Sequence, residues 1–356
     1  MLRGAANRNP INRGHDSAGV LALALPTPYL LFLGDTVESG YAKTAFGLRD
    51  WAPERCVGEL GLAGANVTTG LPSMSPREAY ERGARALLIG VATRGGQVPE
   101  KWLPTLIEAL GVGLDIISGM HDRLNDIPAL IEAANRLGRR LIDVRVPPSD
   151  IPIASGRKRS GKRLLTVGTD CALGKKYTAL AITRGLAARG LNVDFRATGQ
   201  TGIMIAGSGI PIDAVVSDFL AGAAELLSPD AAPDHLDVIE GQGSLFHPSY
   251  AAVTLGLLHG SQPDLFVVCH DPARTHLLGL ADFPLPPIEE LIAQTVTAGR
   301  LTNPAIRCCG VSLNTAALND DAALEVIAAT ARSIGLPAAD PIRGIGFEVL
   351  LDACSE

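Results

Sequence analysis

The stretch LLTVGTDCALGKKYTALAITRGL, from Leu164 to Leu186, decides the fold of its half of the chain. It opens with an apolar run typical of a buried strand, passes through a loop bounded by Gly168 and Gly174, and ends in a helical pattern. Glycines let the backbone N–H groups of such a loop turn inward, and the helix start adds partial positive charge. Lys175 supplies a cation. The stretch therefore predicts a phosphate-binding loop.

This loop departs from the common pattern G-x-x-x-x-G-K-[ST] in its length and in its last position. One more residue separates the two glycines, and Lys176 stands where a Ser or Thr hydroxyl would bind Mg²⁺. The longer loop is similar to that of dethiobiotin synthetase and its relatives, which also begin Gly-Thr-Asp. We therefore expect a phosphate-bearing ligand held without metal-assisted phosphoryl transfer. Its expected binding residues are Gly168, Thr169, Asp170, Cys171, Gly174, Lys175, Lys176 and Tyr177.

Strand-like and helix-like segments alternate along the 356 residues, which predicts an α/β protein with parallel sheets covered by helices. The strands are expected at residues 29–34, 86–91, 114–118, 141–146, 164–167, 193–197, 237–239, 265–269 and 308–313. A linker rich in Pro, Gly and basic residues interrupts the alternation near residue 150. We therefore expect domains at residues 1–150 and 151–356. We interpret the basic residues of the linker as a solvated face: Arg157, Lys158, Arg159, Lys162 and Arg163.

Composition narrows the class of protein. The net charge of −6 and the pI of about 5.7 speak against a general nucleic-acid surface. The six cysteines lack metal-ligand spacing and resemble reduced cytosolic thiols, so we expect no metal and a cytoplasmic location. Pro26 and Pro28 split the apolar segment Ala18–Gly34, which favours two short strands around a turn over a signal peptide. No uninterrupted apolar run is long enough to span a membrane.

Polar residues follow several strands at what should be the ligand-binding edge of the second sheet. Glu240 ends one strand in LDVIEGQGSLFHPSY, and His247 follows it. Either side chain could act as a general base, or Glu240 could cap a helix while His247 lies on a surface loop. In CHDPARTHLLG, Arg274 and His276 could bind a carboxylate, or they could be turn residues.

Other segments give weaker signals. The glycine-rich stretch ATGQTGIMIAGSGIPID, residues 197–213, is expected to form a mobile loop over the site. In the first half, Lys43 and His121 are expected to line the second wall of a cleft. No G-x-G-x-x-G follows a strand there, so the sequence does not support a dinucleotide site in that half.

Taken together, GTDCALGKKYTAL, GQTGIMIAG, EGQGSLFHPSY and CHDPARTHLLG, with YAKTAFGLR and SGMHD upstream, resemble the D-glutamate N-acetyltransferase-like family over nearly the whole chain. The resemblance implies an N-terminal Rossmann-like domain and a C-terminal P-loop NTPase-like domain. It also implies acetyl transfer from acetyl-CoA to the amino group of D-glutamate. Coenzyme A carries phosphates but no γ-phosphate to transfer, which fits a loop without a metal-binding hydroxyl.

The first functional hypothesis is therefore a cytoplasmic N-acetyltransferase that uses acetyl-CoA and an amino acid, with no nucleic acid, membrane or metal partner, and that forms a homo-oligomer. Glu240 is the first choice as general base, with His247 and Asp170 behind it. The expected substrate-binding residues are Lys43, His121, Arg274 and His276. Two alternatives stay open: an ATP-dependent ligase or kinase similar to dethiobiotin synthetase, and a non-catalytic nucleotide-binding protein.

Overall fold

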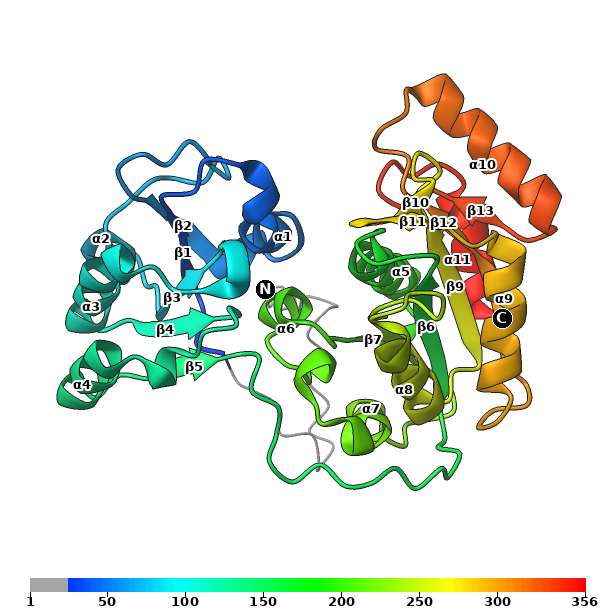
Figure 1. Cartoon of the computed structure of the whole chain (residues 1–356), viewed down its shortest axis with the longest axis horizontal. Helices are drawn as coiled ribbons and strands as arrows, with labels where there is room; N and C mark the ends of the chain where they lie inside the picture. The colour runs from blue at the N-terminus through cyan, green and yellow to red at the C-terminus, as the bar shows by residue number, and fades with distance from the viewer. Residues whose placement is uncertain (1–24) are drawn as a thin grey trace, which may run out of the picture. The chain divides into compact units, whose positions relative to one another are not determined.

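The computed structural model describes residues 25–356, and the chain divides into two compact units (Figure 1). The C-terminal unit comprises Pro148–Gly199 and Ile212–Glu356. The N-terminal unit ends at Pro147 but also contains the later segment Gln200–Pro211. The chain therefore leaves the C-terminal unit after Gly199, adds twelve residues to the N-terminal unit, and returns.

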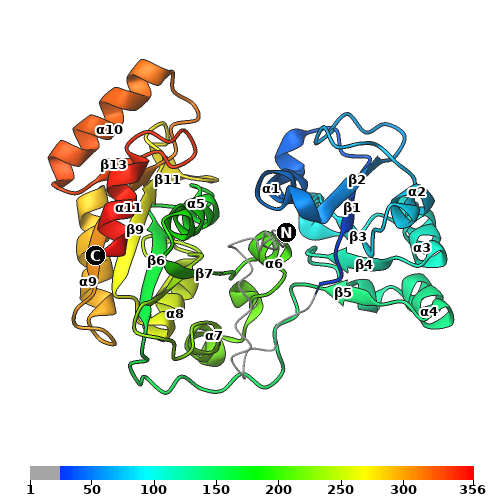
Figure 2. The same ribbon diagram turned by 180° about the vertical axis from the view of Figure 1, so that it is seen from behind.

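The N-terminal unit is built on a five-stranded parallel sheet with strand order β2-β1-β3-β4-β5. Its strands are β1 (Tyr29–Gly34), β2 (Cys56–Gly61), β3 (Ala86–Ile89), β4 (Asp115–Ser118) and β5 (Leu141–Asp143). One face is covered by α1 (Lys43–Trp51) and α6 (Gln200–Ala206), and the other by α2 (Pro76–Glu81), α3 (Leu103–Val112) and α4 (Pro128–Leu137) (Figure 2). Burial on both faces explains why β1, YLLFLG, is apolar throughout.

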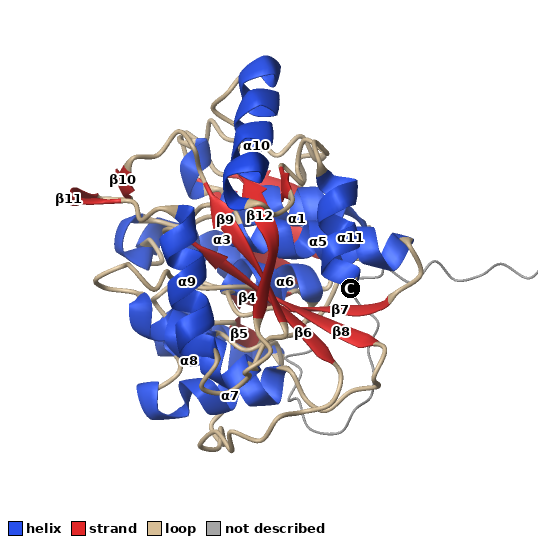
Figure 3. Ribbon diagram, turned by 90° about the vertical axis from the view of Figure 1, so that its right-hand side faces the viewer, coloured by secondary structure: helices blue, strands red, loops and turns tan. Residues whose placement is uncertain are grey.

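The C-terminal unit is built on a six-stranded parallel sheet with order β13-β12-β9-β6-β8-β7. Its strands are β6 (Lys162–Gly168), β7 (Asn192–Arg196), β8 (His235–Ile239), β9 (Leu265–His270), β12 (Arg307–Leu313) and β13 (Ala338–Ala339). Helices α5 (Lys175–Ala188) and α11 (Phe347–Ser355) cover one face, and α7 (Leu220–Leu227), α8 (Ala251–Ser261) and α9 (Ile288–Gly299) cover the other (Figure 3). Helix α10 (Asp320–Ile334) lies beside β13, and β10 (His276–Leu277) pairs with β11 (Leu280–Pro284) as a hairpin.

The predicted α/β class is confirmed, and each strand expected from the sequence within residues 25–356 is present with small shifts at its ends. The expectation of a mobile loop at residues 197–213 was wrong in part. Residues Gln200–Ala206 form α6, whose Ile203, Met204 and Ile205 are buried. The first of the two strands expected in Ala18–Gly34 lies outside the described residues. No helix within residues 25–356 combines the length and the apolar character needed to cross a membrane.

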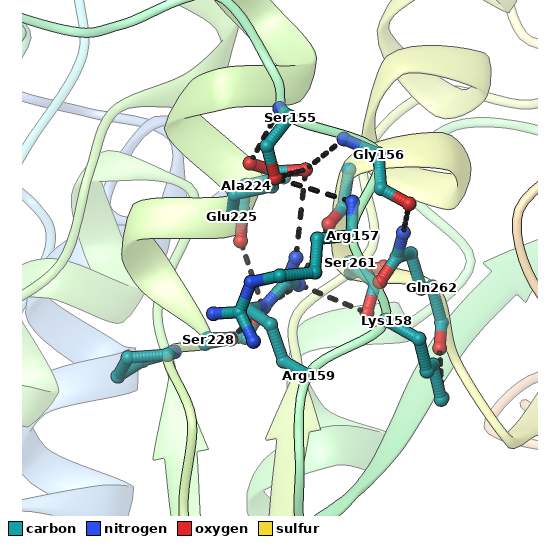
Figure 4. Close-up of polar contacts among 12 residues, drawn as sticks. Ser155, Gly156, Arg157, Lys158, Arg159, Ala224, Glu225, Ser228, Ser261 and Gln262 are labelled. Carbon is teal, nitrogen blue, oxygen red and sulfur yellow. Dashed lines mark hydrogen bonds and ion pairs between the residues drawn. The ribbon is translucent and has the colours of Figure 1, made fainter.

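The interpretation of the basic linker as a solvated face was also wrong in part (Figure 4). Arg157 and Lys158 are exposed, but Arg159 and Arg163 are only 6% and 0% exposed. Arg159 donates hydrogen bonds to the carbonyl groups of Ser228 and Gly260, and burial lowers its pKa to about 10. The linker is therefore anchored to the C-terminal unit by buried guanidinium groups, which turn toward backbone carbonyl groups in place of water.

Candidate active site

The predicted phosphate loop joins the end of β6 to the start of α5. Gly174 adopts a φ of +105°, a left-handed conformation that favours glycine and lets α5 begin at the next residue. The Lys175 side chain is buried, and its Nζ donates a 2.7 Å hydrogen bond to the backbone carbonyl of Asp170. Burial lowers the pKa of Lys175. The loop thus holds a cation turned inward beside the positively polarised start of a helix.

The Asp170 carboxylate holds the loop in shape from the inside. Its Oδ1 accepts a hydrogen bond from the backbone N–H of Cys171, at 2.6 Å. Its Oδ2 accepts from Arg274 Nη1 and from the backbone N–H of Leu278, both at 2.7 Å. Arg274 also donates to the carbonyl groups of Cys171 and Ala172. Asp170 and Arg274 therefore brace the loop against the segment that leads into the β10–β11 hairpin.

Glu240 follows β8, the strand next to β6 in the sheet, and its side chain is only 4% exposed. Its Oε2 accepts hydrogen bonds from the backbone N–H groups of Thr198, at 3.0 Å, and Gly199, at 3.1 Å. Burial raises the pKa of Glu240, while the charge of Lys176 and the two N–H donors oppose that rise. A carboxylate whose pKa is raised toward neutrality is suited to taking a proton from a substrate.

The loop and Glu240 lie close together because the backbone of Gly241 passes against both β6 and Lys175. A Cβ at Gly241 would lie 1.6 Å from the Thr166 carbonyl oxygen and 3.2 Å from the Lys175 side chain. Only glycine permits this approach. The Gly241 N–H also donates to the Thr166 hydroxyl, at 2.9 Å. Sequence adjacency therefore places Glu240 beside the phosphate loop.

His247 is buried on the same side of the site. Its Nδ1 accepts a hydrogen bond from the Ser249 N–H at 3.1 Å, and its ring packs against Tyr250 with centroids 4.5 Å apart. In the neutral ring the proton is therefore on Nε2, which lies 4.0 Å from Asp170 Oδ1. This tautomer makes His247 a hydrogen-bond donor toward the loop, and it favours Glu240 as the base.

The remaining predicted residues of the C-terminal unit take different positions. Thr169 bonds His270 Nδ1 through its hydroxyl, at 3.0 Å. The Lys176 ammonium lies 4.7 Å from the centroid of the Tyr177 ring. His276 is exposed at the start of β10, apart from the buried cluster of Asp170, Lys175, Glu240 and His247.

Thr178 provides no substitute for the missing metal-binding hydroxyl. Its Oγ1 lies 2.8 Å from Ser312 Oγ, inside the sheet, and accepts a contact from the Cys269 thiol at 3.5 Å. Burial raises the pKa of Cys171, which does not favour a nucleophilic thiolate in the loop.

Lys43 and His121 belong to the N-terminal unit. Lys43 is the exposed first residue of α1, and His121 is exposed after β4. Sequence reasoning missed Thr198 and Gly199, whose N–H groups bind Glu240. Both residues lie in the glycine-rich stretch after β7 that the sequence analysis singled out. Residue type alone does not indicate which backbone N–H groups will donate hydrogen bonds.

Comparisons with known proteins agree with this architecture. A family model described as "Domain of unknown function (DUF1611_C) P-loop domain" matches residues 152–351, and one described as "Domain of unknown function (DUF1611_N) Rossmann-like domain" matches residues 60–147. A crystal structure of a DUF1611 family protein from Anabaena variabilis superimposes with a TM-score of 0.79 at 35% identity, covering 92% of this chain and 99% of that one.

Two curated relatives are named D-glutamate N-acetyltransferase. The relative from Tritonibacter scottomollicae is 49% identical, over 92% of this chain and 98% of its own length. The relative from Pseudoalteromonas is 45% identical, over 93% of this chain and 100% of its own length.

The fold and the site define a class of two-domain α/β proteins in which a Rossmann-like domain precedes a P-loop domain. Within that class the chain belongs to the DUF1611 family, the family of the D-glutamate N-acetyltransferase-like proteins, as its motifs indicated.

Proposed function

We propose that this protein is an N-acetyltransferase that moves the acetyl group of acetyl-CoA to the amino group of D-glutamate. The names of the two curated relatives support the reaction class and the acceptor. The observation that carries the proposal is the juxtaposition, through Gly241, of the phosphate loop with the buried carboxylate of Glu240. A phosphate-bearing donor and a proton acceptor are the two things that acetyl-CoA-dependent amide formation requires.

The loop is suited to the phosphates of coenzyme A. Lys175 and Lys176 supply positive charge, and the N-terminus of α5 adds the partial positive charge of a helix start. The Thr178 hydroxyl contacts Ser312 of β12, between α5 and the sheet, so this hydroxyl does not serve the loop. The loop can therefore hold an anion by cationic side chains and backbone N–H groups alone.

The chemical step follows from the geometry around Glu240. Glu240 takes a proton from the acceptor ammonium group, and the free amine attacks the thioester carbonyl carbon. The C–N bond forms and the C–S bond breaks. The thiolate of coenzyme A leaves and takes the second proton that the acceptor nitrogen loses, and Glu240 releases the first proton to solvent. The Nε2–H of His247 and backbone N–H groups are the donors suited to the oxyanion that develops on the carbonyl oxygen.

The test is a binding and turnover panel on the purified protein. Acetyl-CoA and CoA should raise the melting temperature, and D-glutamate with acetyl-CoA should release free CoA thiol. Stabilisation by MgATP but not by CoA would favour an ATP-dependent ligase. Stabilisation by a nucleotide without turnover of any amine or acid would favour a non-catalytic role. L-Glutamate and D-aspartate measure the selectivity for stereochemistry and chain length.

A further inference from the structure

Two thiol groups lie against each other inside the C-terminal unit. Cys309 lies in β12, and Cys354 lies in α11, 45 residues later in the chain. Their Sγ atoms are 3.7 Å apart, and both side chains are only 1% exposed. All six cysteines of the chain are free thiols. The fold therefore brings two reduced sulfur atoms from distant segments of the chain into direct contact.

This thiol pair is separate from the candidate active site. Cys309 lies near the amino end of β12, whereas the phosphate loop follows the carboxyl end of β6 in the same parallel sheet. The proposed acetyl transfer uses neither thiol. A single buried cysteine acts as a small apolar side chain, which other residues could replace. Two cysteines in contact offer in addition a reaction with each other.

The geometry selects Cys309, and not its neighbour Cys308, as the partner of Cys354. A disulfide bond holds its sulfur atoms about 2.05 Å apart, so the Sγ atoms of Cys309 and Cys354 need to approach by less than about 2 Å. The Cys308 thiol instead donates to the carbonyl oxygen of Gly310, at 3.5 Å. Cys308 therefore provides a matched control for Cys309.

We propose that Cys309 and Cys354 are a redox-modification site, at which a hydroperoxide such as hydrogen peroxide converts the two thiols into a disulfide bond. One sulfur attacks a peroxide oxygen, the O–O bond breaks, and a sulfenic acid and water form. The other sulfur attacks the sulfenic sulfur, the S–S bond forms, the S–O bond breaks, and a second water leaves. The sulfurs lose two electrons to the peroxide, and the two thiol protons end in the two water molecules.

The disulfide bond would fasten α11 to the sheet. Helix α11 packs against β12, β13 and α5 (Figure 1). Its buried Leu350 and Leu351 hold it in place. Arg189, which follows α5, also donates a 2.9 Å hydrogen bond to the exposed Asp352, but such surface ion pairs contribute little. A bond between residues 45 positions apart restricts the unfolded chain, so oxidation should make the C-terminal unit more resistant to unfolding.

Burial determines how this thiol pair reacts. The hydrogen bond with the Cys354 thiol and burial raise the pKa of Cys309, so little of its thiolate is present at neutral pH. An oxidant reaches the sulfurs when α11, a helix of nine residues, opens locally. Oxidation should therefore be slow, and it should be faster in urea at concentrations too low to unfold the protein.

The test maps the disulfide bonds of the whole chain after treatment with hydrogen peroxide, under conditions that fully oxidise glutathione. Trypsin leaves Cys308 and Cys309 in one peptide and Cys354 in another. These two peptides should be cross-linked, and dithiothreitol should separate them. The cross-link should persist in Cys308→Ala and be lost in Cys309→Ala. Fragmentation of the wild-type cross-linked peptides identifies the bonded sulfur if a variant does not fold.

Three outcomes of this mapping overturn the proposal. They are a wild-type chain without the cross-link, a cross-link that persists in Cys309→Ala, and a cross-link that forms only in the unfolded chain.

Melting curves of the oxidised and the reduced protein provide a second measurement. The cross-linked wild type should melt roughly 5 °C or more above the reduced protein. The difference should disappear on addition of dithiothreitol and in Cys354→Ala. Equal melting temperatures of the cross-linked and the reduced wild type would show that the bond does not fasten α11. Neither measurement depends on acetyl transfer, so the result stands apart from that of the proposed function.

Discussion

Lys175 Nζ donates a 2.7 Å hydrogen bond to the backbone carbonyl of Asp170, inside the loop that α5 closes. The cation is thus held by the loop itself at the position where a phosphate would need it. Burial lowers the pKa of Lys175, because removal from water disfavours the charged ammonium and the Asp170 carboxylate opposes this only in part. An anion in the loop would supply the remaining compensation, and so the loop gains more from a phosphate than an exposed lysine would.

Replacing Lys175 by Met should therefore weaken CoA binding by roughly 10- to 100-fold, the scale of a lost hydrogen bond to a charged group. The apolar stem of Met fills the same space, so the melting temperature should not fall. Lys162→Met is the matched control, since Lys162 is exposed on β6 and bonds only the backbone of Glu356 among its described contacts. Calorimetry that gives equal CoA affinity for both variants would show that the loop does not bind the phosphates.

Glu240→Gln should lower kcat by roughly a hundredfold or more, the usual scale for a general base, with CoA affinity little changed. The amide oxygen can still accept from the N–H groups of Thr198 and Gly199, so the local structure should persist. Turnover is measured at saturating acetyl-CoA and D-glutamate. A variant that keeps near-full turnover excludes Glu240 and moves the search to His247 and Asp170.

The raised pKa of Glu240 predicts a second effect of the same substitution, on stability. A carboxyl group whose pKa is raised by folding binds its proton more tightly in the native state than in the unfolded state. The free energy of unfolding therefore falls as the pH rises from 4.5, the usual pKa of a glutamate, through the raised pKa of Glu240. Glu240→Gln should therefore melt at a higher temperature than the wild type at pH 8. The gain should vanish below pH 4.5, where both states of the wild type are protonated. Melting curves of both proteins from pH 4 to 8 provide the measurement. A Glu240→Gln variant that melts at a lower temperature than the wild type at pH 8 would show that the buried charge of Glu240 does not destabilise the fold.

Turnover should survive excess EDTA. Asp170, Cys171 and His247 each place one possible ligand atom within 4.8 Å of the others. However, both oxygens of Asp170 already accept hydrogen bonds, and Lys176 stands at the usual metal-hydroxyl position. Activity lost on chelation and restored by Mg²⁺ would favour the ATP-dependent alternative.

Arg159→Met should destabilise the protein by about 3–5 kcal/mol, because it removes the cation beside the half-buried Glu225 and a buried donor to the Ser228 and Gly260 carbonyl groups. Arg157→Met is the control, since Arg157 is an exposed partner of Asp230 and such pairs contribute about 0–1 kcal/mol. Urea unfolding of both variants provides the measurement. Equal losses in the two variants would show that burial of Arg159 adds nothing.

The sequence predicted the parts of this fold that have a strong local signal. Apolar runs such as β1 and β9 identify buried parallel strands, and the Gly168–Lys175 loop identifies the strand–loop–helix unit around it. Strand β2, CVGELG, was missed because it contains two glycines and an acidic residue. Its Glu59 is nevertheless buried, because it accepts hydrogen bonds from the N–H and hydroxyl groups of Thr69.

The candidate site could be proposed from the sequence where residue type signals a role, and not where only the position of a residue in the fold does. Glu240 and Lys175 were evident from residue type and from their place after a strand or at a helix start. Arg159 was assigned to solvent because its burial depends on carbonyl groups about 70 to 100 residues away in the chain, at Ser228 and Gly260.

The insertion of Gln200–Pro211 into the N-terminal unit has a consequence for biosynthesis. Domains of a nascent chain usually fold in order as they leave the ribosome. Here the first sheet is complete at β5, yet the helix that bonds Tyr29 and Thr44 is synthesised only after β6, α5 and β7. The first unit must therefore wait, with one face of its sheet partly uncovered, until much of the second has emerged. Because the N-terminal unit includes residues 200–211, no single break point in the gene separates the sequences of the two units.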